Sequence, residues 1–398
     1  MVPLMSAPAR RADSIQPFYV MEIVKAAARL EAQGRSIIHM SIGEPDFAAP
    51  DPVQEAARHA LAAGATGYTP ALGLDALRER IAGHYRTALS VPVDPSRVVV
   101  TAGASGALLL AMAALLERDR EVLLPDPCYP CNRNFVTAFE GNARLLPCGP
   151  ETAFQPSAEA VQAAWTERTA GLLLASPSNP TGTSIAPATL RALLDAVRVR
   201  GGFSVVDEIY RGLVYDHPPS TALALADDVV VINSFSKYFH MTGWRLGWLV
   251  APAALVPTLE RLAQNLYICA STLAQRAALA CFEPDALAIY EARRLEFQRR
   301  RDYLVPALRG LGLDVPVTPD GAFYVYVDIS RAAADSWQFA FDLLDQAGVC
   351  VVPGRDFGEH APQRYVRVSY ATSLANLEEA VERIRRFLNR RTGTGRVT

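Results

Sequence analysis

The chain has 398 residues, of which 50% are hydrophobic and 20% are charged, and its formal net charge is −2. This balance lacks the basic excess that nucleic-acid or membrane-surface binding requires, so we expect neither partner. No run of about 18 residues is free of charges and turn formers, and the first residues lack the apolar core of a secretory signal, which predicts a cytoplasmic protein.

Apolar strand-like runs alternate with longer helical stretches between about residues 97 and 250. The runs are RVVVTAG, EVLLPDP, ARLLPCG, GLLLASPSNPTG, GFSVVDEIY and VVVINSFSK. Most of them are nearly continuous Val, Leu and Ile, as in strands that are buried on both faces of a mainly parallel sheet. Helical segments between them, such as residues 184–201, fit right-handed crossovers, so we predict an α/β fold.

The pattern changes after about residue 284, where a long charged helix over residues 286–312 precedes further alternation of strands and helices. This alternation predicts a smaller α+β domain. We therefore divide the chain into an N-terminal arm over residues 1–45, a large domain over 46–284 and a small domain over 285–398. We expect the arm to pack with the small domain.

Polar clusters follow four of the predicted strands, namely TAGAS, SPSNPTG, DEIY and SFSK. In a parallel sheet, ligands bind beyond the carboxyl ends of the strands, so these clusters are expected to meet on one rim. Four clusters on one rim indicate a cofactor site.

Residues 103–105 stand between a strand and a helix, where free backbone amides and the helix dipole favour an anion. Neither a P-loop nor a G-x-G-x-x-G pattern is present. Ser234, Ser236 and Arg245 could close around the same phosphate with two hydroxyls and a guanidinium. The alternative for residues 103–105 alone is a tight connection between two elements.

Asp207 ends an apolar run, where a lone carboxylate is costly unless a cation faces it. A protonated heterocyclic nitrogen would supply that cation, and Tyr210 could reach another side of the same ring. The alternative is a salt bridge at the sheet edge beside a packed tyrosine, and this motif alone does not decide between the two.

The chain has only two lysines, Lys25 and Lys237, although Lys and Arg together number 39. Arg serves as the surface cation, whereas an amine that sheds its proton and attacks carbon has to be Lys. Lys237 lies beside the phosphate candidates and on the rim of Asp207, and Gly243 and Gly247 are expected to let the chain turn closely beneath a cofactor. A lysine amine, a phosphate cradle and a carboxylate for a ring nitrogen are what pyridoxal phosphate takes from its protein, so we predict this cofactor.

Cys128 and Cys131 form a C-x-x-C, a spacing found in redox pairs and in half zinc sites. No second C-x-x-C and no paired histidine accompany them, so we predict incidental cysteines and no metal site. His240 is the histidine nearest to Lys237 in the sequence, and we expect it to pack or to contact a loop.

Seven motifs occur in the order expected of one family: SIGEPDF, GYTPALGLDALRERI, PDPCYP, SPSNPTG, DEIY, SFSKYFHMTGWRLGW and RYVRVSYA. They cover nearly the whole chain, which thereby resembles the class I/II aminotransferases of fold type I. The resemblance implies a large domain with a mainly parallel seven-stranded sheet flanked by helices, and a smaller α+β domain. It also implies pyridoxal phosphate as cofactor and a homodimer with shared active sites.

The resemblance assigns five side chains to the cofactor ring. Lys237 would carry the internal aldimine and then move the proton between substrate and cofactor. Asp207 would pair with the pyridine nitrogen. Asn179 and Tyr210 would hydrogen-bond the phenolic oxygen, and Tyr129 would stack on the ring. The implied catalytic residues are Lys237, Asp207 and Tyr210.

The other implied contacts hold the phosphate and the substrate. Arg367 matches the arginine that clamps the substrate α-carboxylate, and Gly43 of the arm would approach the same group as part of a lid. Arg364, three residues earlier in a strand, should face the other way. Tyr68 resembles a residue that reaches the phosphate of the neighbouring subunit. The implied phosphate ligands are Gly103, Ala104, Ser105, Ser234 and Arg245, with Ser236 in addition, and Tyr129 and Asn179 would also contact substrate.

The implied reaction is ping-pong transamination from an L-amino acid to a 2-oxo acid, a step of amino acid metabolism and biosynthesis. A pyridoxal phosphate-dependent C–S β-lyase on the same fold is the alternative, because it would use nearly the same residues. Ser105 stands where some aspartate-using relatives have a lysine, which weakens an aspartate assignment. The aromatic residues Phe18, Tyr19, Tyr129 and Tyr267 are compatible with neutral or aromatic amino acids, so the substrate stays open.

Overall fold

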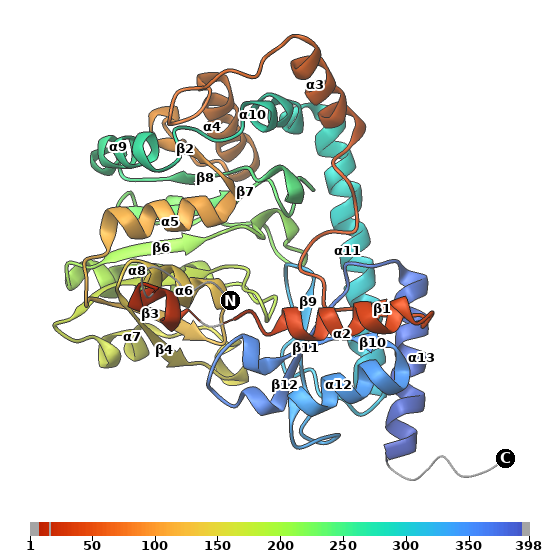
Figure 1. Cartoon of the computed structure of the whole chain (residues 1–398). Helices are drawn as coiled ribbons and strands as arrows, with labels where there is room; N and C mark the ends of the chain where they lie inside the picture. Colours follow the sequence, from red (N-terminus) through yellow and green to blue (C-terminus); the bar gives the residue numbers. More distant parts are fainter. Residues whose placement is uncertain (1–7, 16, 392–398) are drawn as a thin grey trace.

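A computed structural model of the chain describes residues 8–15 and 17–391. Its centre is a seven-stranded sheet in the order β2-β8-β7-β6-β5-β3-β4 (Figure 1). Of these strands, β8 runs antiparallel to both neighbours and the other pairings are parallel, which confirms the predicted fold class. The strands are β2 (Val98–Thr101), β3 (Glu121–Asp126), β4 (Asn142–Pro147), β5 (Thr169–Ala175), β6 (Phe203–Asp207), β7 (Val229–Ser234) and β8 (Gly247–Val250).

Six of the seven strands coincide with apolar runs that predicted them, and the exception is β8. No strand was predicted over residues 247–250, the first two of which belong to the Lys237 motif SFSKYFHMTGWRLGW. A Cβ atom at Gly247 would come within 2.8 Å of the Ala104 nitrogen, so the predicted close approach is right at this position. At Gly243 a Cβ atom would meet no protein atom within 4 Å, so a close approach to the cofactor there stays a prediction.

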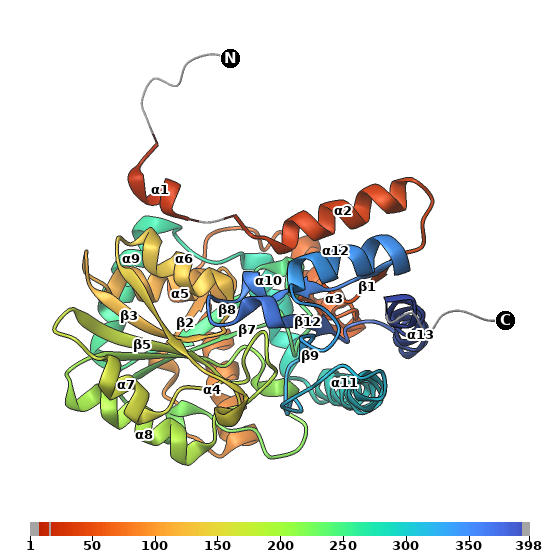
Figure 2. The same ribbon diagram turned by 90° about the horizontal axis from the view of Figure 1, so that it is seen from below.

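Burial on both faces of the sheet explains the continuous apolar runs. In β2, Val98 and Val100 pack on one side while Val99 packs on the other, and β6 and β7 alternate in the same way. The first face is covered by α4 (Asp75–Leu89), α7 (Ala158–Ala164) and α8 (Pro187–Val199), together with α3 (Asp51–Ala62) and α10 (Thr272–Ala278). The second face is covered by α5 (Gly103–Leu115), α6 (Pro130–Ala138) and α9 (Val256–Leu266) (Figure 2).

A second, smaller unit contains an antiparallel three-stranded sheet in the order β11-β12-β9. Beside it, β1 (Ile38–His39) pairs in parallel with β10 (Val349–Cys350), which brings the N-terminal arm to the C-terminal part of the chain. The remaining elements of this unit are β9 (Tyr324–Asp328), β11 (Val352–Pro353), β12 (Tyr365–Ser369), α12 (Ser336–Ala347) and α13 (Leu374–Arg391).

The N-terminal arm contacts both parts of the molecule. Ile23 and Ala27 of α2 (Val20–Ala32) are buried in the core of the smaller unit. The short helix α1 (Arg10–Ser14) lies on α6, where Arg11 forms an ion pair of 3.0 Å with Glu140. The arm therefore crosses from the helices of the large sheet to the smaller unit.

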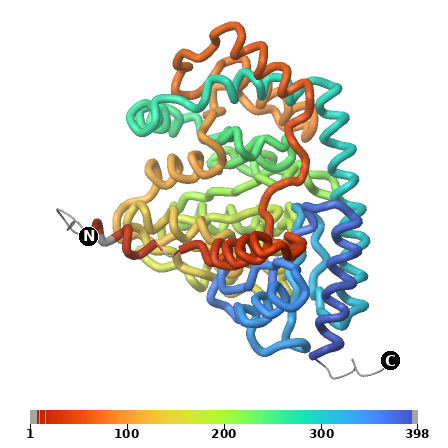
Figure 3. Tube along the Cα trace, turned by 45° about the vertical axis from the view of Figure 1, so that its right-hand side comes forward, coloured from red at the N-terminus to blue at the C-terminus, as the bar shows by residue number. Residues whose placement is uncertain are grey.

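The long helix α11 (Pro284–Gly310) runs along the side of both cores and beside α13 (Figure 3). Tyr290 belongs to the core of the large sheet, whereas Phe297 and Leu304 belong to the core of the smaller unit. Among the residues that the structure describes, none of the helices has the length and apolar character needed to cross a bilayer.

Candidate active site

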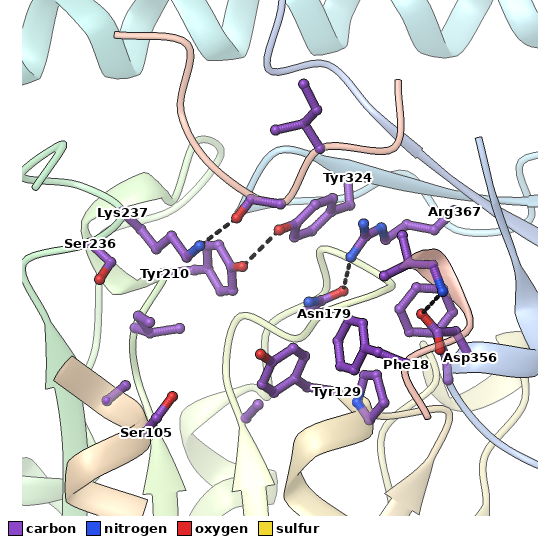
Figure 4. A pocket seen from close by; sticks show the side chains of 18 of the residues that line it. Phe18, Ser105, Tyr129, Asn179, Tyr210, Ser236, Lys237, Tyr324, Asp356 and Arg367 are labelled. Atoms are coloured by element: carbon purple, nitrogen blue, oxygen red, sulfur yellow. Dashed lines mark hydrogen bonds between the residues drawn. The ribbon is translucent and has the colours of Figure 1, made fainter. Parts of the chain in front are cut away.

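A cavity of about 320 Å³ opens at the carboxyl ends of the central strands, between the large sheet and the smaller unit (Figure 4). Its walls come from the N-terminal arm, from the loops after the strands, and from β9 and β12. Eleven of the residues predicted for the site line this one cavity. They are Gly43, Ala104, Ser105, Tyr129, Asn179, Asp207, Tyr210, Ser236, Lys237, Arg245 and Arg367.

Lys237 follows the end of β7 and points its amine into the cavity, where the amine donates a hydrogen bond to the carbonyl oxygen of Gly43 (Figure 4). The amine nitrogen lies 5.8 Å from the centre of the Tyr210 ring. Burial lowers the pKa of the Lys237 amine from 10.5 to about 8, aided by the charges of Arg367 and Arg245. A larger fraction of the amine is therefore neutral and nucleophilic near physiological pH.

Asp207 stands at the end of β6 with 6% of its surface exposed. Its carboxylate accepts a hydrogen bond of 3.0 Å from the Ile209 amide, and within the described part of the chain it forms no ion pair that would match the predicted edge salt bridge. Burial raises the pKa of the carboxyl from 3.8 to about 6. This environment suits a carboxylate that receives its cation from a protonated ring nitrogen.

Arg367 is buried in β12 and is held by two acceptors from other segments. One terminal nitrogen donates to the amide oxygen of Asn179 at 2.9 Å, and the other donates to the Ser41 carbonyl at 2.7 Å. Its Nε atom is buried and has no protein partner among the described residues. Arg364 instead bonds Asp328, away from the cavity, as predicted. The guanidinium is therefore fixed in place with a donor left over for a carboxylate ligand.

The predicted phosphate end lies at the start of α5. The residue before this helix, Ala102, makes no side-chain cap, so the first amides of the helix are left for a ligand. Gly103 has φ +76°, and a Cβ atom there would lie 2.8 Å from a terminal nitrogen of Arg245, so glycine lets the guanidinium approach the helix. The same guanidinium donates to the Thr242 carbonyl at 3.0 Å. The amides, the guanidinium and the Ser236 hydroxyl fit a phosphate.

Three residues predicted for the cofactor do not line this cavity. Ser234 lies one layer deeper, where its hydroxyl donates to the Leu246 carbonyl at 3.0 Å and accepts from the Ser236 amide at 3.0 Å. Gly103 lies under Arg245. Tyr68 is 83% exposed and does not line the cavity of its own chain, so its contact with a neighbouring subunit stays a prediction.

Of the four aromatic residues suggested for the substrate, Phe18 and Tyr129 line the cavity, with ring centres 6.2 Å apart. Tyr19 packs instead on Trp337, and Tyr267 packs near α9, so neither lines the cavity of its own chain. Phe18 stands two residues before the start of α2 in the arm and enters the cavity.

Cys128 and Cys131 form no disulfide, and no cluster of three metal-ligating side chains occurs within residues 8–15 and 17–391. His240 is buried against Phe47, with ring centres 5.5 Å apart. Burial lowers the pKa of His240 to about 3, so it is a neutral packing residue.

The sequence did not indicate two residues that shape the cavity, Tyr324 and Asp356. The hydroxyl of Tyr324 is 2.8 Å from that of Tyr210. Asp356, in the turn Gly354–Asp356, accepts hydrogen bonds from the amides of Tyr19 and Val20 at 3.0 and 3.2 Å. Strand alternation could have placed Tyr324 on the face of β9 opposite to Phe323, but it does not reveal what lies opposite.

Comparison with known proteins agrees with this geometry. The family described as aminotransferase class I and II matches residues 35–384. A valine–pyruvate aminotransferase of Mycobacterium tuberculosis is 40% identical over 379 residues, which are 94% of this chain and 97% of that protein. An aspartate/prephenate aminotransferase of Thermus thermophilus is 36% identical over 384 residues, which are 96% of this chain and 98% of that protein.

Solved structures show the same fold. The crystal structure of an aminotransferase from Mycobacterium tuberculosis has a TM-score of 0.93 and 39% identity, and the match covers 97% of this chain and 100% of that one. The aspartate aminotransferase from Thermus thermophilus with maleate has a TM-score of 0.91 and 35% identity, with 96% and 100% covered.

Family, fold and cavity now agree on one chemistry. The predicted cofactor is confirmed, because the class I and II aminotransferases depend on pyridoxal phosphate. The residues present also fit it, with a lysine amine, a buried carboxylate, an uncapped helix start and an arginine with a spare donor in one cavity. The chain therefore belongs to the class I and II aminotransferases and is a pyridoxal phosphate-dependent enzyme.

Proposed function

We propose that this aminotransferase takes the amino group of a neutral L-amino acid with an apolar side chain, branched or aromatic, and passes it to a 2-oxo acid in a ping-pong reaction. The observation that carries the proposal is a set of apolar side chains that line the cavity. An apolar substrate side chain gains from burial there at about 25 cal/mol per Å². This set, which we call the apolar wall, consists of Phe18, Val20, Met21, Val24, Ile42 and Leu108.

The charges of the cavity support a neutral side chain. Three cations line it within the described chain, namely Lys237, Arg245 and Arg367. Under this proposal each of the three cations already has a role: the Lys237 amine reacts, Arg245 holds the phosphate and Arg367 holds the α-carboxylate. None is left to pair with a charged substrate side chain. Two carboxylates also line the cavity, those of Asp207 and Asp356, and the carboxylate of Asp356, which accepts from the Val20 amide, would repel a second carboxylate on the substrate.

The names of relatives point in two directions. The valine–pyruvate aminotransferase of Mycobacterium tuberculosis agrees with an apolar donor, while the aspartate/prephenate aminotransferase of Thermus thermophilus does not. Ser105 supports the first direction, because a neutral hydroxyl stands where some aspartate-using relatives place a lysine. All of these relatives are named as transaminases, which does not favour the C–S β-lyase alternative.

Bound pyridoxal phosphate supplies the electron sink for the carbanion. The chain's own residues bind and move protons around it. Arg367 orients the α-carboxylate. The neutral amine of Lys237 accepts the proton from the substrate Cα and later donates it to C4′ of the cofactor. Asp207 holds a proton on the ring nitrogen, while Tyr210 and Asn179 donate to the phenolic oxygen.

We also propose that the enzyme is a cytoplasmic homodimer in which Tyr68 of one subunit reaches the phosphate in the other subunit's site. Its exposure in a single chain supports this role, as does the exposure of Leu266 and Ile268, which are apolar and 58% and 47% exposed. Sedimentation at micromolar concentration would test the dimer, and a Tyr68→Phe variant that keeps cofactor affinity unchanged would contradict the shared site.

The substrate proposal is tested with leucine, asparagine and aspartate, which have nearly the same shape and differ in polarity and charge. Each donor is mixed alone with the holoenzyme, and conversion of the cofactor to its amino form is followed by absorbance. We expect leucine to exceed aspartate in kcat/KM by at least about 100-fold, since an unpaired carboxylate is costly to bury. Aspartate as the best donor would refute the apolar assignment. Pyruvate and ammonia released from cysteine conjugates, without conversion of the cofactor, would favour the lyase.

A further inference from the structure

Tyr324, the first residue of β9, lies between two residues with different tasks (Figure 4). Its hydroxyl oxygen is 2.8 Å from that of Tyr210, and the centre of its ring is 4.4 Å from the guanidinium carbon of Arg367. Its side chain is 0% exposed. One tyrosine therefore touches both the residue assigned to the cofactor ring and the residue assigned to the substrate carboxylate.

Of the two possible donors in the hydrogen bond between the Tyr210 and Tyr324 hydroxyls, only one suits a bound cofactor. A tyrosine hydroxyl donates one hydrogen and can accept on its oxygen. If Tyr210 directs its hydrogen at the phenolic oxygen, Tyr324 has to donate in the contact between the two hydroxyls. Within the described residues, the Tyr324 hydroxyl has no second protein partner that would compete for its hydrogen. Donation to Tyr210 polarises that hydroxyl and strengthens it as a donor.

The contact with Arg367 uses a different part of the same side chain. The ring face of Tyr324 packs against a guanidinium whose terminal nitrogens are already fixed by Asn179 and Ser41. A cation–π contact depends on the ring and persists when the hydroxyl is removed. Phenylalanine at this position would therefore keep the support for Arg367 and lose the contact with Tyr210.

We infer that Tyr324 is a positioning residue for transamination, acting on Tyr210 through its hydroxyl and on Arg367 through its ring. The inference rests on the proposed roles of Tyr210 at the phenolic oxygen and of Arg367 at the substrate carboxylate. The hydroxyl aims and strengthens the Tyr210 donor, and the ring keeps the guanidinium in register with the substrate. The two actions are separable by substitution.

The test compares holoenzymes of the wild type, Tyr324→Phe, Tyr324→Leu and Tyr210→Phe. A hydrogen bond to the phenolic oxygen stabilises the form in which that oxygen is negative, so weakening it raises the pKa of the cofactor's absorbance titration. We expect Tyr324→Phe to raise this pKa by less than Tyr210→Phe does. The double variant should match Tyr210→Phe, because the hydroxyl of Tyr324 acts only through Tyr210. The KM for the amino donor should stay within about 2-fold for Tyr324→Phe and rise about 10-fold for Tyr324→Leu.

Tyr326→Phe is the matched control, since Tyr326 is a buried tyrosine two residues further along β9 that does not line the cavity. It should change neither the titration nor the KM.

A Tyr324→Phe titration identical to the wild type, while the Tyr210→Phe titration shifts, would overturn the inference and leave the role of Tyr210 intact. No shift for Tyr210→Phe would overturn both. The donor ranking of leucine over aspartate is a separate readout, so the proposed function can fail or hold independently. Should Tyr324→Leu fail to fold, the phenylalanine variants still decide the hydroxyl's role.

Discussion

The amine of Lys237 donates its hydrogen bond to the carbonyl oxygen of Gly43, so the segment after β7 is joined directly to the N-terminal arm. Both residues line the cavity. The carbonyl oxygen can only accept a hydrogen bond. It therefore orients the amine by accepting one of the amine's hydrogens. The position of the arm and the orientation of the reactive amine are therefore coupled.

The lowered pKa of Lys237 predicts how fast the cofactor-free enzyme takes up pyridoxal phosphate. The neutral amine is the reactive form, so the rate of appearance of the cofactor band should rise with pH and reach half of its maximum near pH 8, where an ordinary lysine would need pH 10.5. Lys237→Ala should show neither the band nor turnover. The exposed Lys25 offers the control, and Lys25→Ala should behave as the wild type. A half-maximum near pH 10 would show that burial does not lower this pKa.

The raised pKa of Asp207 predicts a pH-dependent instability of the cofactor-free protein. The folded carboxyl titrates near 6 and the unfolded one near 3.8, so the folded state binds the proton more tightly and stability falls as pH rises through this window. The loss amounts to about 3 kcal/mol in the free energy of unfolding. Asp207→Asn has no charge to bury. Between pH 4 and 6.5, its free energy of unfolding should therefore rise relative to that of the wild type by this amount. Thermal unfolding of both cofactor-free proteins measures it.

Cofactor loading should remove this difference, because the ring nitrogen then faces the carboxylate with a positive charge. A stability gap between Asp207→Asn and wild type that does not change with pH would contradict the burial argument. A gap that survives loading would contradict the pairing with the ring nitrogen.

Asp356 supplies an N-terminal cap to α2 from the smaller unit, since both of its oxygens accept amides at the start of this helix. Asp356→Ala should cost about 1 kcal/mol of stability and raise the KM of apolar donors, because Phe18 and Val20 lose their fixed position in the cavity wall. Steady-state kinetics measure the KM, and hydrogen exchange at Tyr19 and Val20 measures the loosened helix start.

The matched control is Asp335, which caps α12 by accepting from the Gln338 amide at 2.9 Å and does not line the cavity. Asp335→Ala should cost a similar stability and leave the KM unchanged. Equal KM values for the two variants would mean that the cap on α2 does not position the cavity wall.

Two glycines close to Lys237 predict opposite outcomes for the same substitution. Gly247→Ala would press a methyl group against backbone atoms of Gly103 and Ala104 at 2.7 and 2.8 Å, at the start of α5. We expect a loss of about 1 to 3 kcal/mol of stability and weaker binding of pyridoxal phosphate, since the amides of that helix start would shift. Gly243→Ala meets nothing within 4 Å and should be neutral within about 0.5 kcal/mol. Cofactor titration of the two variants checks this, and equal affinities would be contrary evidence.

Most of the large sheet could be predicted from the sequence, because most of its strands are nearly continuous apolar runs that are buried on both faces. The edge strand β4 is less buried and has a weaker pattern. The strand β8 was not predicted: it is as short as β2, and it begins with Gly247, a residue type that weakens a strand signal. Its place in the sheet is decided by contacts with the preceding strand β7 and with β2, which is distant in sequence.

The site divides in the same way. Asp207 was predictable because a lone carboxylate at the end of an apolar run is costly, and Lys237 because it is one of only two lysines. Arg367 was predicted only through the resemblance of RYVRVSYA to the family motif. Asp356 was not, because its carboxylate is matched to backbone amides of residues 19 and 20, and amides leave no mark in a sequence. Tyr324 stands in the strand GAFYVYVD, where a tyrosine is an ordinary packing residue until its neighbour across the cavity is known.

The helix α11 has a mechanical consequence for the whole enzyme. It is 27 residues long, and at about 1.5 Å per residue it is a rod of about 40 Å with its first turns in one core and its later turns in the other. Cutting the chain ahead of α11 would remove Tyr290, whose hydroxyl contacts the Cys281 sulfur at 3.4 Å, from the core of the large sheet. The two parts are therefore not interchangeable modules, and heat should melt them in a single step.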